Sequence, residues 1–277
     1  MKKRLKSSLK YFVLVLVSAV FLFPIAWGLI CSFKPEAEIL SYPPHWIPKA
    51  FTASNYSEVL KKYPYLAWGQ NSLITTVAGT LLILICSSLA AYAFGRFQFR
   101  GKKVLYGTVV AMLLIPIQAY VIPLYLMCAK LKLLNTLTAI ILPSVANVTS
   151  IFILTSFFHS LPNELEEAAR IDGCSEFRIF AQIMLPLSKP ALSTVTFLTF
   201  ISNWNSFLWP MIAIRDDDLK TLPVGIAQFM GTANSNAQFQ YGTALAGCMM
   251  AIVPTLIVFL ALQRYFVQGI ASSGIKG

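Results

Sequence analysis

The sequence LITTVAGTLLILICSSLAAYAF at residues 73–94 contains no Asp, Glu, Lys or Arg. A helix needs about 20 apolar residues to cross roughly 30 Å of hydrocarbon, so this stretch is long enough to span a membrane. Comparable uncharged stretches lie at 11–33, 104–129, about 133–158, 191–214 and about 242–262. Buried helices of soluble proteins rarely reach this length six times. The sequence therefore predicts an all-α integral membrane protein with six transmembrane helices.

The composition of the whole chain supports the same class. Of 277 residues, 57% are hydrophobic and 12% are charged, and the mean hydropathy is +0.68. A soluble domain carries about 25% charged residues because polar groups must cover its core. The five cysteines are scattered without a CxxC pair, which predicts free packing residues and no disulfide or metal site.

The net charge of +11 indicates the orientation of the chain in the membrane. Cytoplasmic loops carry an excess of Lys and Arg. Six spans put both termini on one side, and that side holds 14 of the 22 basic residues, concentrated at 1–10 and 96–103. We therefore expect both termini in the cytoplasm. No block of basic and aromatic residues remains to form a nucleic-acid surface.

The spans and loops predict the organisation of the chain. The apolar run at 11–33 is longer than the core of a signal peptide, so we expect a retained anchor helix. The predicted segments are a cytoplasmic N-terminus (1–10), a first transmembrane helix (11–33), an outer loop (34–70), a five-helix core (71–265) and a cytoplasmic tail (266–277). The core includes a cytoplasmic loop at 160–189 and an outer loop at 215–241. The small polar run 231–236 in that outer loop suits either an adaptable contact loop or a passive connector.

The cytoplasmic loop 160–189 has the clearest local signals. Ser160-Leu-Pro-Asn163 followed by acidic residues predicts a helix start, with Ser160 as its N-cap and the acids near the positive helix end. Gly173 predicts the end of this helix after Asp172. Ser175 predicts the cap of a second short helix that runs from Glu176 to about Met184 before Pro186.

The first of these helices is a candidate docking surface. Leu165, Ala168, Ala169 and Asp172 share one face by their three- and four-residue spacing, and the two alanines would let another surface approach the backbone. The alternative is an amphipathic helix on the membrane surface. Acids at 164, 166 and 167 disfavour contact with an anionic leaflet.

Together these residues resemble a known family. Glu167-Ala168-Ala169, three residues, Gly173, nine residues, Ile183, one residue and Leu185-Pro186 is similar to the "EAA" loop of bacterial ABC importer permeases. The segments 203–210, 221–225 and 268–277 resemble the carbohydrate-importing branch of that family. The resemblance covers nearly the whole chain.

The resemblance implies a type I ABC importer permease fold in the bacterial cytoplasmic (inner) membrane, with the EAA loop docked on an ATPase as a coupling helix. It implies a second homologous permease, two ATPase subunits that bind ATP and Mg²⁺, and an extracytoplasmic binding protein that delivers a sugar. Carried over by position, the ATPase contacts are Glu167, Ala168, Ala169, Asp172, Gly173, Gln268 and Gly269. The expected binding-protein contacts are Thr232, Asn234 and Asn236. The chain carries no G-x-x-x-x-G-K-[ST] phosphate loop, so we expect a non-catalytic subunit without a cofactor of its own.

Polar and aromatic residues inside the predicted spans are candidates for the substrate pathway, because such groups are costly in lipid unless they face protein or water. These candidates are Gln118, Tyr120, Asn147, Ser150, Asn203, Trp204 and Asn205. Aromatic faces and amides suit a sugar; the alternative role is hydrogen bonding between helices. Pro116 and Pro123 predict a kink in the third span.

An ion-coupled secondary transporter is the alternative function. Such carriers commonly keep carboxylates in mid-membrane, whereas all 11 acids of this chain fall in loops or tails. A membrane enzyme would need an acid–base pair or metal ligands near a membrane face, which two isolated histidines and scattered acids do not supply. Five of the 11 acids lie within 164–176, on the basic side of the membrane, which marks this loop for a protein partner.

Overall fold

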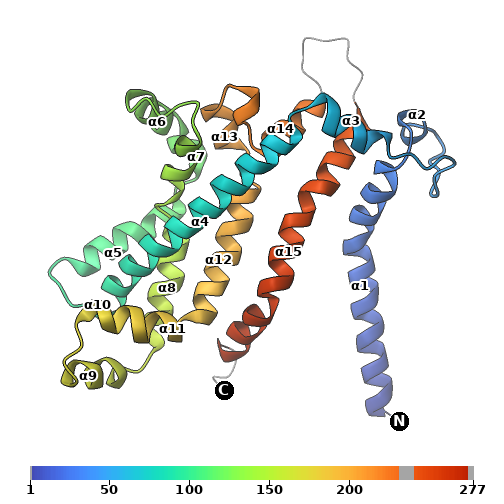
Figure 1. The fold of residues 1–277 in the computed structure, drawn as a ribbon. Coiled ribbons are helices and arrows are strands. Elements are labelled where there is room, and N and C mark those ends of the chain that lie inside the picture. The colour runs from blue at the N-terminus through green and yellow to red at the C-terminus, as the bar shows by residue number, and fades with distance from the viewer. Residues whose placement is uncertain (1, 231–239, 274–277) are drawn as a thin grey trace. The chain divides into compact units, whose positions relative to one another are not determined.

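The computed structural model describes residues 2–230 and 240–273, and every regular element within these ranges is a helix (Figure 1). The elements are α1 (Lys2–Ser32), α2 (Glu36–Ile39), α3 (Ser54–Lys62), α4 (Tyr65–Arg96), α5 (Lys102–Ala111), η1 (Met112–Leu114), α6 (Ile117–Lys130), α7 (Leu137–Ser144), α8 (Val148–Ser160), α9 (Glu164–Ile171), α10 (Glu176–Ile179), the π-helical turn η2 (Phe180–Met184), α11 (Leu185–Leu187), α12 (Lys189–Trp204), α13 (Leu208–Ala213), η3 (Asp217–Leu219), α14 (Leu222–Ala227), η4 (Gln228–Met230) and α15 (Tyr241–Ser273). These bounds confirm the all-α class.

The helices form two compact units. The first contains Met1–Leu66 and Val224–Val253. Within it, the buried side chain of Asn55 on α3 donates from Nδ2 to the carbonyl oxygens of Ser32 and Lys34, each at 2.8 Å. The carboxylate of Glu36 accepts the backbone N–H groups of Tyr241 and Gly242 at 2.7 and 2.8 Å. These bonds satisfy free donors in the first turn of α15.

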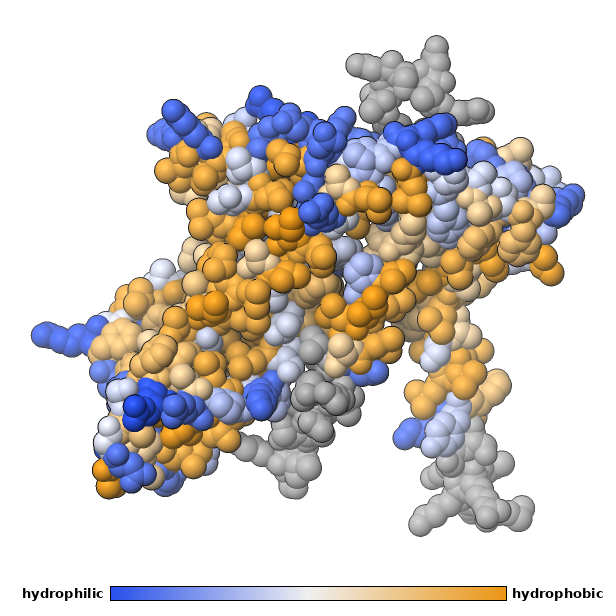
Figure 2. Space-filling model, in the orientation of Figure 1, coloured by the Kyte–Doolittle hydropathy of each residue, from blue (hydrophilic) through white to orange (hydrophobic). Residues whose placement is uncertain are grey.

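The second unit contains Ala67–Pro223 and Pro254–Gly277. In this unit α8 packs along α12, with α9 and α10 at one end and α6, α7 and α13 at the other (Figure 1). Its main core gathers buried side chains such as Tyr92, Leu154, Phe158 and Ile179. Figure 2 shows a mostly hydrophobic surface between the two ends of this unit, which are more hydrophilic.

Four helices among the described residues are long and apolar enough to cross a membrane. They are Leu9–Ser32, Tyr65–Arg96, Leu137–Ser160 and Tyr241–Ala261. Two further pairs pass the same test only together: Lys102–Leu114 with Ile117–Lys130, bent by 106°, and Glu176–Leu187 with Lys189–Trp204, bent by 78°. The described chain therefore has four such spans, or up to six if each bent pair is one span.

Prolines explain where the predicted third and fifth spans are interrupted. The third breaks at Ile115–Pro116, because Pro116 lacks the N–H that would continue the helix, whereas Pro123 lies inside α6. The predicted fifth span, 191–214, is not one helix: α12 ends at Trp204 and α13 begins at Leu208. Pro210 is the third residue of α13, where its missing N–H needs no partner, so it suits a helix start.

Candidate functional site

The loop at 160–189 forms the two predicted short helices, α9 and α10. Gly173 has φ +79°, and the N–H groups of Gly173 and Cys174 donate to the carbonyls of Arg170 and Ala169 at 3.1 and 2.9 Å. This is a Schellman ending, which needs a residue that tolerates the left-handed conformation. The Ser175 side chain accepts from the N–H of Arg178 and caps α10. The predicted glycine ending and the predicted second cap are both confirmed.

Two local predictions in this loop are wrong. Ser160 is the last residue of α8, and its hydroxyl donates to the carbonyl of Phe157 at 2.7 Å, so Asn163 takes the N-cap position of α9. The second helix also continues through Pro186, by way of η2 and α11. A π turn changes the hydrogen-bond register, which accommodates a proline that cannot donate.

One face of α9 packs inward and the other is exposed. Glu166 and Ala169 are only 3% and 4% exposed to solvent, whereas Ile171 is 86% exposed. The exposed residues of the loop include Leu165, Glu167, Ala168, Asp172 and Gly173. The prediction that Ala169 shares a face with Ala168 is therefore wrong. The small side chain of Ala169 instead lets α9 lie close against the core of the second unit.

Ion pairs hold the inward face of α9. Arg96 at the end of α4 donates from Nε to Glu166 Oε1 at 2.8 Å, and both side chains are at most 5% exposed. Arg170 donates from Nε to Glu176 Oε1 at 2.6 Å, which connects α9 to α10. This hydrogen bond lowers the pKa of Glu176 and raises that of Arg170.

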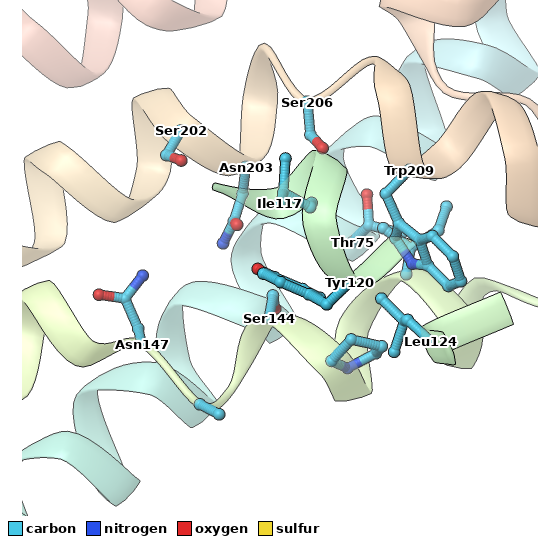
Figure 3. Close-up of a pocket in the computed structure, with 13 residues that line it drawn as sticks. Thr75, Ile117, Tyr120, Leu124, Ser144, Asn147, Ser202, Asn203, Ser206 and Trp209 are labelled. Carbon is cyan, nitrogen blue, oxygen red and sulfur yellow. The ribbon is translucent and has the colours of Figure 1, made fainter. Parts of the chain in front are cut away.

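A polar pocket of about 200 Å³ lies in the second unit, between α4, α6, α7, α12 and α13 (Figure 3). Three predicted pathway residues line it: Tyr120, Asn147 and Asn203. Figure 3 shows the tyrosine hydroxyl and the two amides around the same space. The pocket thus offers the aromatic face of Tyr120 and two amides, which is chemistry suited to a sugar.

Helix ends position the two amides. Asn147 precedes α8, and its Oδ1 accepts from the N–H and the hydroxyl of Ser150 at 2.9 and 2.7 Å, which caps that helix. The cap engages the carbonyl oxygen, so the NH₂ group is the part that can serve a ligand. Asn203 lies in the last turn of α12. A Cβ at Gly79 of α4 would lie 3.1 Å from Asn203 Nδ2 and 3.2 Å from Ser144 Oγ, so this glycine permits the close approach of α4.

The other predicted pathway residues lie elsewhere. Ser150 is buried in the cap, and Trp204, 4% exposed, stacks on Phe200 with ring centroids 6.0 Å apart. Gln118 and Asn205 are exposed and do not line the pocket; Asn205 Nδ2 donates to the carbonyl of Ile201 at 3.0 Å.

The sequence prediction also missed several residues of the pocket. These polar or aromatic residues are Thr75, Ser144, Ser202, Ser206 and Trp209. Trp209 Nε1 donates to the carbonyl of Ala139 at 2.8 Å, which fixes the indole in the wall. The three-residue spacing of 203, 206 and 209 was the available signal for two of them.

Several predicted contacts fall outside these two sites. Thr232, Asn234 and Asn236 lie outside the described residues. Gln268 and Gly269 lie in the helical backbone of α15, which continues past residue 266, where the tail was expected to begin. No group of His, Cys, Asp and Glu in the described part of the chain could hold a metal ion.

Comparisons with known proteins agree with this architecture. The family model described as "Binding-protein-dependent transport system inner membrane component" matches residues 83–272. The arabinooligosaccharides transport system permease protein AraQ of Halalkalibacterium halodurans is 35% identical over 94% of this chain and 93% of its own length. The lactose transport system permease protein LacG of Rhizobium radiobacter is 32% identical over 99% and 98%. The crystal structure of a bacterial ABC transporter involved in the import of the acidic polysaccharide alginate contains a chain that superposes with a TM-score of 0.84 at 27% identity, covering 96% of this chain and 98% of that one.

Proposed function

Because this chain belongs to the family of binding-protein-dependent transport system inner membrane components, we propose that it forms half of the translocation pathway of an ATP-driven oligosaccharide importer. Two relatives that match almost its full length are permeases of arabinooligosaccharide and lactose transport systems, and this chain is a permease of a sugar ABC transporter. Arabinooligosaccharides and lactose in their names support a substrate of two or more sugar units. A second, homologous permease would complete the pathway.

The partner proposed for α9 is an ATPase subunit, and the exposed face of α9 is the observation that carries this proposal. Leu165 and Ile171 are exposed apolar residues on a loop that the charge pattern assigns to the cytoplasm. Ala168 lies between them and leaves room for another surface. Glu167 and Asp172 are exposed beside this patch and can accept hydrogen bonds from basic groups of the partner.

The chemistry of ATP belongs, in this proposal, to the partner. Two ATPase subunits would hold ATP and Mg²⁺, and this chain would contribute no catalytic group. Closure of the ATPase pair would displace α9, and the permease would change between outward- and inward-facing states by rigid-body motion. Gln268 and Gly269, near the end of α15, are proposed as a second ATPase contact.

Substrate is proposed to pass the polar pocket of the second unit. Tyr120 would provide an aromatic face for a sugar ring, and the amides of Asn147 and Asn203 would bond to its hydroxyl groups. An extracytoplasmic binding protein would deliver the sugar and contact Thr232, Asn234 and Asn236. Both termini are placed in the cytoplasm on the basis of the basic residues.

Co-purification tests the proposed function. The tagged chain is expressed with its partner permease and ATPase, and the complex is isolated with wild-type α9 or with Glu167→Ala. We expect the wild-type complex to retain the ATPase and to import sugar in proteoliposomes only with ATP and a binding protein. Sugar transport by the purified chain alone, driven by an ion gradient, would show that the chain is a secondary transporter.

A further inference from the structure

Besides its ion pair with Glu166, Arg96 makes further contacts with the loop 160–189, called the docking loop below, and with the end of α8. Its Nη1 also donates to the carbonyls of Phe158 and Leu161 at 3.1 and 3.0 Å, and its Nη2 donates to the carbonyl of Pro162 at 3.3 Å. Carbonyls at a helix C-terminus lack partners within the helix, and a cation is favourable there. One side chain of α4 therefore binds the end of α8, the connection that follows it, and α9.

These contacts belong to a series of bonded polar side chains that starts and ends on α4, called the ring below. Glu166 also pairs with Arg170, Oε2 to Nη2, at 3.4 Å, and Arg170 pairs with Glu176. The hydroxyl of Tyr92 donates to Glu176 Oε2 at 3.3 Å. Tyr92 and Arg96 are four residues apart on α4, so the ring leaves α4 at one turn, passes through α9 and α10, and returns to α4 at the adjacent turn.

From this ring we infer that Arg96 and Glu166 are positioning residues for energy coupling, which hold α9 in one orientation on the ends of α4 and α8. The inference rests on the proposed docking of α9. If α9 could rotate against the core, displacement by the ATPase would be lost in that rotation. We call the Arg96–Glu166 ion pair, together with the bonds of Arg96 to the three carbonyls, the clamp. With the clamp in place, α9, α4 and α8 move together, and the displacement reaches α4, whose Thr75 lines the polar pocket.

The physical chemistry of buried ion pairs separates this role from simple stabilisation. Replacement of both members by apolar residues of similar volume is often neutral for stability, because no charge is left buried without a partner. Such a replacement removes the directional bonds that fix the orientation of α9. The double variant Arg96→Met/Glu166→Leu is therefore expected to fold and assemble but to couple poorly.

The experiment uses the complete importer in proteoliposomes and measures sugar transported per ATP hydrolysed. The matched control is Arg100→Met/Glu164→Leu, which removes one exposed basic and one exposed acidic residue near the same loop. We expect the clamp variant to assemble and to transport at least about fivefold less sugar per ATP, the lower end of typical coupling between two sites. The control is expected to retain the wild-type ratio.

Equal ratios in the clamp variant and the control would overturn the inference. If the double variant does not assemble, Arg96→Lys enters the same assay with the same two outcomes, because lysine keeps the charge but cannot reach Glu166 and three carbonyls at once. Glu167→Ala, measured in parallel, reports on docking itself. Loss of transport in Glu167→Ala with a normal ratio in the clamp variant refutes only the clamp; normal transport and ATPase retention in Glu167→Ala refute the proposed docking.

Discussion

Gly242→Ala should destabilise the first unit by an amount that follows from one contact. A Cβ at Gly242, in the first turn of α15, would lie 2.6 Å from Nδ2 and 2.8 Å from Oδ1 of Asn55. These distances are shorter than any van der Waals contact. Asn55 is 5% exposed, and its amide holds the end of α1 through bonds to Ser32 and Lys34. The Asn55 side chain cannot move away without breaking both bonds.

The expected cost combines three contributions. Two lost hydrogen bonds cost about 1 kcal/mol each, and a buried amide without partners costs roughly 1–3 kcal/mol more. Alanine returns up to about 1 kcal/mol relative to glycine within a helix. The net loss of about 2–4 kcal/mol corresponds to a decrease of roughly 5–15 °C in melting temperature for a chain of this size.

Thermal unfolding of the detergent-purified protein measures this cost. Gly107→Ala is the matched control, because a Cβ at Gly107 in α5 would have no atom within 4 Å; it should be neutral or slightly stabilising. Gly242→Ala is repeated in an Asn55→Ala background, where the obstructing amide is absent. The reasoning would be refuted if Gly242→Ala lowered the melting temperature no more than Gly107→Ala does, or if it lowered it equally with and without the Asn55 side chain.

Three further predictions concern the candidate sites. Glu167→Ala should lower transport several-fold with unchanged membrane insertion, because its carboxylate is exposed on the helix proposed to dock on the ATPase. Glu164→Ala on the same helix should transport normally, and equal uptake by both variants in proteoliposomes would contradict the proposed docking. Asn203→Ala should raise the sugar concentration for half-maximal transport about 2–10-fold, the value of one lost hydrogen bond, and an unchanged concentration dependence would exclude this pocket as a sugar site. Arg170 lowers the pKa of Glu176 in the folded state, so the stabilisation from this ion pair is present above the unfolded pKa of about 4.3 and is lost as the pH falls through the lower folded value. Glu176→Gln should therefore flatten the fall in melting temperature below about pH 5. An unchanged pH profile would show that the pair does not contribute to stability.

The uncharged stretches predicted the positions of the helices better than their continuity. The run 73–94 lies inside α4, a single helix that extends to Arg96. The run 191–214 is equally free of charge, yet it contains two helices separated at Asn205–Phe207. Absence of charge reports that a segment tolerates an apolar environment. It does not show whether the backbone hydrogen bonds of a helix continue through the segment, and prolines such as Pro210, which lack an N–H, interrupt them.

The pocket was only partly predictable for the same reason. Choosing polar residues within apolar stretches identified Tyr120, Asn147 and Asn203, but gave no direction for each side chain. Trp204 is adjacent to Asn203 and points into the core instead, because neighbouring residues of a helix are about 100° apart. Asn147 has a second role as the cap of α8, which the sequence could have indicated only if the end of α7 had been known.

The acidic cluster at 164–176 shows what burial adds to a count of charges. Counted together, the five acids make this loop an acidic stretch on the side of the chain that is otherwise basic. The count predicts a protein partner but does not say which acids meet it. Glu166 and Glu176 are bound to arginines of this chain, so they orient the loop. The other three, Glu164, Glu167 and Asp172, are exposed. Glu167 and Asp172, the acids that the family resemblance assigns to the ATPase contact, belong to this exposed set and can meet a partner without breaking an ion pair.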